Sequence, residues 1–99
     1  MKMTRWTGGA ALVLLVTAFS WADEAADLFK KGSKALENQD YDKAIILFTK
    51  SVKLNPKSPT AYLMRGVAHG RKGDRDEALA DYAKVLKLDP ENKIGRAHV

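Results

Sequence analysis

The chain has 99 residues, with 17 lysines and arginines against 12 aspartates and glutamates, and it contains no cysteine. Lys2, Arg5 and Arg96 lie near the two ends, so 14 basic residues face 12 acidic ones elsewhere, which gives no indication of nucleic-acid or anionic-lipid binding. The lack of cysteine excludes disulfides, thiol catalysis and thiolate metal sites.

Residues 1–22 have the layout of a secretory signal peptide. A positive start is followed by the apolar run Ala10–Val16, and small residues stand three and one positions before Asp23. This order predicts cleavage after Ala22 and export of the remaining chain. The alternative is an uncleaved signal anchor, since 17 consecutive uncharged residues are at the short end of what can cross a bilayer of about 30 Å.

Two helices are predicted next. Apolar and small residues at spacings of three and four predict an amphipathic helix over residues 25–36. Asp40 is the expected N-cap of a second helix from Tyr41, which Asn55 and Pro56 end because proline lacks an amide donor. The second helix carries a broad apolar band of Ala44, Ile45, Leu47, Phe48, Ser51, Val52 and Leu54.

A second helix pair follows with the same layout. Pro59 suits the first turn of a third helix, and Gly73-Asp74 is expected to form the turn before a fourth helix, which ends at Asp89-Pro90. No stretch alternates with the period of a strand, so the sequence predicts an all-α fold. The residues expected to face inward on the fourth helix are Ala78, Leu79, Tyr82, Val85, Leu86 and Leu88.

The two pairs are copies of one unit at a shift of 34 residues. A fixed period in this range indicates stacked helix pairs that form an α-solenoid. The matched glycines predict a close approach of two helix backbones, and Phe48 and Tyr82 are expected to fill the space between adjacent pairs. The identical positions are Gly32/Gly66, Asp40/Asp74, Asp42/Asp76, Ala44/Ala78, Lys50/Lys84, Lys53/Lys87, Leu54/Leu88 and Pro56/Pro90.

These positions resemble the tetratricopeptide repeat, whose pattern has glycine in the first helix, then alanine-x3-aromatic, then a closing proline. The resemblance divides the chain into a first repeat at 25–58 and a second at 59–92. Four residues depart from the pattern in the first helices: Lys31 and Arg65 replace leucine, and Ala35 and His69 replace tyrosine.

The resemblance implies that the first helices of successive repeats line a concave groove for a peptide or a partner helix. Members that clamp a chaperone carboxylate use a lysine and asparagines here, and this chain has Phe29 and Ser33 instead, so that clamp is not expected. The groove's mixed apolar and basic character favours a peptide with apolar anchors and some acidic residues. The residues implied to line it are Phe29, Lys30, Ser33, Leu63, Met64, Val67 and Arg71.

Residues 93–99 do not continue the repeat. Ile94–Val99 resembles the translation of a common sequencing adapter, which predicts a non-native tail on a truncated protein; a genuine short tail is the alternative. Two repeats without a capping helix would leave the last apolar face open, because about three are normally needed for stability. We therefore expect the fragment alone to be marginally stable or to self-associate through its last repeat.

Nothing in the sequence suggests catalysis, a metal site or a bound cofactor. His69 lacks a second histidine or a nucleophile at a suggestive spacing, and the carboxylates near Asp23 and Asp74 lie at predicted helix starts, where they complement the helix dipole. We expect a non-enzymatic scaffold or adaptor of the bacterial periplasm or envelope that binds proteins or peptides, with no small-molecule substrate. The alternatives are a scaffold anchored in the membrane by residues 1–22, or the N-terminal repeats of a longer envelope enzyme.

Overall fold

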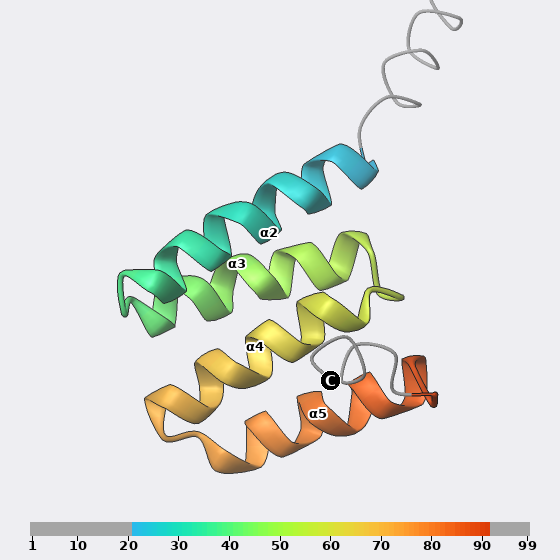
Figure 1. Ribbon diagram of the computed structural model, residues 1–99. Helices are drawn as coiled ribbons and strands as arrows, with labels where there is room; N and C mark the ends of the chain where they lie inside the picture. The colour runs from blue at the N-terminus through green and yellow to red at the C-terminus, as the bar shows by residue number, and fades with distance from the viewer. Residues whose placement is uncertain (1–20, 92–99) are drawn as a thin grey trace, which may run out of the picture.

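The computed structural model describes residues 21–91, which form four helices stacked in antiparallel succession (Figure 1). Each helix packs against the next one, and α2 also touches α4. Within residues 21–91 there is no strand, so the predicted all-α solenoid of two helix pairs is confirmed. Residues 1–20 of the predicted signal peptide and the predicted tail 93–99 lie outside the described residues, whereas Trp21 and Ala22, the last two residues of the predicted signal peptide, form the start of α2. The helices are α2 (Trp21–Glu37), α3 (Tyr41–Leu54), α4 (Pro59–Lys72) and α5 (Arg75–Leu88).

Local sequence signals set the helix boundaries. The Asp40 carboxylate accepts a hydrogen bond from the Lys43 amide at 3.3 Å, which confirms Asp40 as the N-cap of α3. The Ser58 hydroxyl caps α4 in the same way, with Pro59 as the first helical residue. Gly73 ends α4 at φ +102°, a left-handed conformation that glycine adopts without a steric cost.

The core of the first pair is the ring of Phe48, which is fully buried. A Cβ atom on Gly32 would lie 2.8 Å from this ring, so glycine is needed to let the ring seat against α2. The atoms nearest to Gly32 are thus those of an aromatic ring, and the buried cluster that contains Phe48 also includes Ala68 of α4, in the next pair. Phe48 of α3 packs on α2 of its own pair, where its ring centroid lies 5.6 Å from that of Phe29.

The second pair repeats this contact with less burial. A Cβ on Gly66 would meet Tyr82 at 2.7 Å, but Tyr82 is only half-buried. Two residues expected to face inward on α5 do not: Leu79 and Leu86 are 57% and 59% exposed. Their helix face needs a further packed helix to cover it, and α5 lies at the end of the described stack (Figure 1).

A largely buried ion pair lies within the second pair. The Arg65 guanidinium donates two hydrogen bonds to the Asp81 carboxylate, at 2.8 and 2.7 Å, and a third to the Thr49 hydroxyl at 3.3 Å. The bonds to Asp81 raise the pKa of Arg65 above its usual value. Three successive helices are thereby joined by one side chain, which accounts for the arginine that departs from the repeat pattern.

We predict that Gly32→Ala destabilises the protein although alanine favours helix. The new Cβ must displace the fully buried Phe48 ring, and overpacking of this kind costs about 1–3 kcal/mol, more than the gain of about 1 kcal/mol in helix propensity. Urea unfolding followed by circular dichroism measures the change. The matched control is Gly70→Ala, whose Cβ would have neighbours no closer than 3.8 Å and should stabilise α4. Destabilisation of both variants alike would contradict the packing assignment.

We predict that Arg65→Leu costs about 3–5 kcal/mol of unfolding free energy, because it leaves the buried Asp81 carboxylate without its partner. Adding Asp81→Leu removes that charge as well, so the double variant should be more stable than the single one. The same urea unfolding measurement completes the double-mutant cycle. A double variant at or below the stability of Arg65→Leu would show that the ion pair is not what holds these helices.

Candidate functional site

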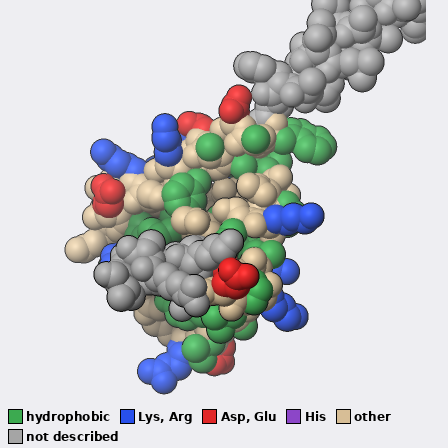
Figure 2. Space-filling view, turned by 45° about the vertical axis from the view of Figure 1, so that its right-hand side comes forward, with side chains coloured by type: hydrophobic (Ala, Val, Ile, Leu, Met, Phe, Trp, Pro, Cys, Tyr) green, Lys and Arg blue, Asp and Glu red, His purple; other side chains and the backbone are tan. Residues whose placement is uncertain are grey.

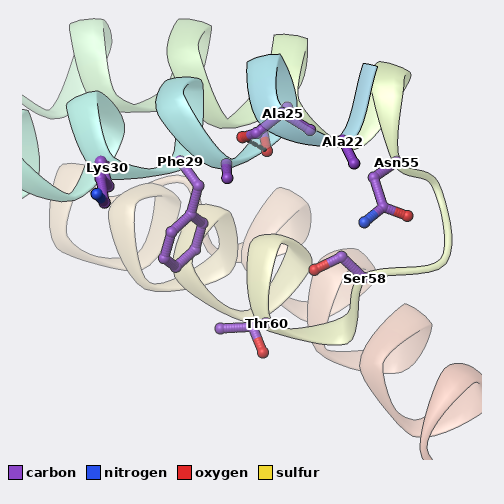
Figure 3. Close-up of a pocket in the computed structure, with 9 residues that line it drawn as sticks. Ala22, Ala25, Phe29, Lys30, Asn55, Ser58 and Thr60 are labelled. Carbon is purple, nitrogen blue, oxygen red and sulfur yellow. Dashed lines mark hydrogen bonds between the residues drawn. The ribbon is translucent and has the colours of Figure 1, made fainter. Parts of the chain in front are cut away.

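A cavity of about 400 Å³ opens between the N-terminal half of α2 and the start of α4 (Figure 3). The wall from α2 is mostly apolar, and the opposite rim is polar. The α2 side is made by Ala22, Ala25, Ala26, Phe29 and Lys30. The rim is made by Ser51 and Asn55 at the end of α3, Ser58 in the connection, and Thr60 in the first turn of α4.

Hydrogen bonds hold this rim in place. The buried Ser51 hydroxyl donates to the Ala25 carbonyl at 3.0 Å and so ties the end of α3 to α2. Ser58 is fixed as the N-cap of α4, and the Asn55 amide donates to the Ser51 carbonyl. Because these groups are engaged in structure, the shape of the cavity is largely preformed.

The structure brings two of the seven predicted groove residues into the cavity. Phe29 projects its ring from α2 toward α4, and Lys30 stands beside it (Figure 3). Phe29 is half-buried, and its inner part packs on the same core cluster as Met64 and Val67 of α4.

The remaining predicted residues lie outside the cavity lining. Ser33 on α2 and Leu63 on α4 are half-buried, while Arg71 is exposed in the last turn of α4. By helical spacing, Thr60 shares one face of α4 with the four predicted residues of that helix, so these residues extend the cavity wall along α4. That they bind a partner stays a prediction.

Sequence reasoning missed most of the lining. Ala22, Ala26 and Phe29 fall at spacings of four and three, a stripe that was available in the sequence, but Ala22 was assigned to the signal peptide. The sequence predicts Asn55 only as the end of the second helix, and no pattern in it marks Ser58 as a lining residue. Their approach to α2 depends on how the connection between α3 and α4 folds back, which no local pattern reports.

The electrostatics of the cavity are simple. Among the described residues that line it, Lys30 is the charged one and none carries a carboxylate. On the face drawn in Figure 2, hydrophobic side chains appear in several separate places, and most lysines and arginines stand at the margin. The site therefore offers apolar contact area, hydroxyl and amide groups, and a positive charge.

Other chemistry finds little support in residues 21–91. Over that part of the chain, no three histidine, cysteine, aspartate or glutamate side chains come close enough to hold a metal ion. The partly buried His69 ring lies 3.4 Å from the Asp74 carboxylate across the α4–α5 turn. None of the described helices is both long and apolar enough to span a membrane.

Comparisons with known proteins identify the family of the repeated helix pair. A sequence model described as Tetratricopeptide repeat matches residues 29–93, more than half of the chain. The chain is similar to Small glutamine-rich tetratricopeptide repeat-containing protein 2 of Mycosarcoma maydis, with 36% identity over 75 residues, which is 76% of this chain and 21% of that protein.

Two further relatives are Hsp70-Hsp90 organizing protein 2 of Arabidopsis thaliana and Heat shock protein STI1 of Saccharomyces cerevisiae. The first is 36% identical over 62% of this chain and 11% of its own length. The second is 33% identical over 72% of this chain and 18% of its own length. The chain thus spans about a fifth or less of these curated relatives.

Proposed function

This chain belongs to the tetratricopeptide repeat family, and we propose that it works as a non-enzymatic protein-interaction module that binds a peptide or a partner helix. The binding surface is the groove between α2 and α4. Similarity to a relative whose name describes it as organizing Hsp70 and Hsp90 supports an adaptor role, in which the module holds another protein.

The observation that carries this proposal is the preformed cavity beside Phe29. A cavity of about 400 Å³ is large enough for one or two side chains, and it is walled by alanines and an aromatic ring with polar groups on one rim. Such a site takes an apolar anchor residue of a peptide or helix, while hydroxyl and amide groups orient the backbone.

The basic residues of the groove restrict the class of peptide that we propose as its ligand. Lys30 lines the cavity, and Arg71 lies three turns beyond Thr60 in the last turn of α4, so the predicted groove residues include two positive charges. Exposed charges of this kind contribute more to selectivity and association rate than to affinity. The proposed ligand is therefore a peptide with one or two apolar anchors and acidic residues near them.

We predict that peptides selected against the full chain from a random displayed library carry an apolar residue next to acidic ones. Thr60→Trp should weaken binding of these peptides at least tenfold, because an indole would fill the cavity from its rim. Lys30→Glu should weaken acidic peptides more than neutral ones. Fluorescence anisotropy with labelled peptides measures each affinity.

The matched control is Lys50→Trp, which places the same indole on an exposed position of α3 away from the cavity. It should leave peptide affinity unchanged. The proposal fails if the library yields no binder, or if the selected peptides bind the Thr60→Trp and wild-type chains equally well.

The proposed location is the bacterial periplasm or envelope, supported by the signal-like layout of residues 1–22. We predict that Edman sequencing of the exported protein reads from Asp23. Cleavage at this point removes Trp21 and Ala22 from the start of α2, so the cavity wall of the mature chain is made by Ala25, Ala26, Phe29 and Lys30. It leaves Asp23 and Glu24 at the start of α2, where negative charge complements the helix dipole. A retained Met1 in the membrane fraction would instead support the anchored form, and a retained Met1 in the cytoplasm would refute export.

A further inference from the structure

A second surface lies on α5 and shares no residue with the cavity. We define the α5 stripe as Asp76, Leu79, Ala83 and Leu86, which are all exposed. The spacings of three, four and three place them along one face of the helix. At the 34-residue shift they correspond to Asp42, Ile45, Thr49 and Val52 of α3.

The corresponding face of α3 is covered, and the covering helix is α4. The Lys72 ammonium lies 2.6 Å from the Asp42 carboxylate, and the Arg65 guanidinium donates to Thr49. Between these contacts the small side chain of Ala68 is buried on the same face of α4, and Ala61 is buried one turn before Arg65. Because the helices are antiparallel, a lysine in the last turn of α4 meets an aspartate in the first turn of α3.

Covering changes the exposure of otherwise equivalent residues. Val52 is 6% exposed under α4, whereas its counterpart Leu86 is 59% exposed. Ile45 is half-buried, whereas Leu79 is 57% exposed. The α5 stripe is thus a surface of the same kind as the covered face of α3.

Helix α5 also carries residues of the kind by which α4 covers α3. Ala83 and Lys87 repeat the alanine-x3-lysine spacing of Ala68 and Lys72, and Lys87 stands in the last turn of α5 next to the stripe. The α5 face is therefore complementary to itself. We propose that two copies of this chain pair through their α5 stripes, antiparallel and related by a two-fold axis.

In this arrangement Asp76 of each copy meets Lys87 of the other, as Asp42 meets Lys72 within one chain. Leu79 and Leu86 then pack over the exposed Ala80 and Ala83 of the other copy, whose small side chains allow close approach. A parallel pairing would instead place the two Asp76 carboxylates side by side, where they repel.

The opposite end of the stack does not suit the α5 stripe. The residues of α2 that correspond to the covering face of α4 are Asp27, Lys31, Lys34 and Asn38, all exposed. Leucines placed on this charged face would desolvate it without compensation. Head-to-tail filaments are therefore disfavoured, and pairing stops at a dimer with one groove on each copy.

Sedimentation velocity of the full chain tests the proposal between about 1 μM and about 1 mM. The wild-type chain should show a concentration-dependent monomer–dimer equilibrium. Leu79→Glu, Asp76→Lys and Lys87→Asp should each weaken association at least tenfold. The combination of Asp76→Lys with Lys87→Asp should restore it, because the exchanged charges meet again across the two-fold axis.

The double variant and a control on α3 distinguish pairing through the α5 stripe from other causes of association. Both charge reversals oppose the helix dipole, so restored pairing in the double variant cannot come from a more stable α5. Ile46→Glu removes another exposed apolar residue, on α3, and should leave association unchanged. The proposal is overturned if the wild-type chain is monomeric throughout, if Ile46→Glu weakens association as much as Leu79→Glu, or if the double variant stays monomeric.

Discussion

The ring of Phe48 lies against the backbone of α2 at Gly32, and the rest of the structure depends on this contact. A Cβ atom at position 32 would stand 2.8 Å from the ring, so glycine lets the two helices pack closely with an aromatic side chain between them. Gly66 and Tyr82 make the same contact in the second pair. The helix propensity lost at each glycine, about 1 kcal/mol, is offset by burial of a large ring.

A helix pair built in this way is incomplete by itself, because the aromatic helix has a second face that only the next pair can cover. The α4 helix does this for α3 and places Arg65 between three helices, where it bonds Thr49 and Asp81. The same geometry makes the first helices α2 and α4 face each other across the cavity beside Phe29 (Figure 3). The groove is thus a direct consequence of stacking.

The two ends of the stack differ in chemistry. The outer face of α2 is charged, while the α5 stripe is apolar with an acidic and a basic residue at its ends. The charged face of α2 is therefore suited to solvent, whereas the α5 stripe is suited to packing against another helix. A module that binds a ligand in its groove and pairs through α5 would bring two bound ligands together, which is what an adaptor in an assembly requires.

The sequence by itself determined the four helices and most of their limits, although α2 begins at Trp21, earlier than the predicted residue 25. Asp40, Pro59 and Gly73 act through hydrogen bonds and backbone angles within a few residues, and the 34-residue period specifies which residues are equivalent. Phe29 and Lys30 of the candidate site followed from resemblance to the family. Only the tertiary structure decided that Phe48 packs within its pair, that Asp81 is buried by Arg65, and that Leu79 and Leu86 remain exposed. Local patterns could not reveal burial, because it depends on which helix lies opposite. They could not place Asn55 and Ser58 at the cavity, because these residues reach it through the folded connection between α3 and α4.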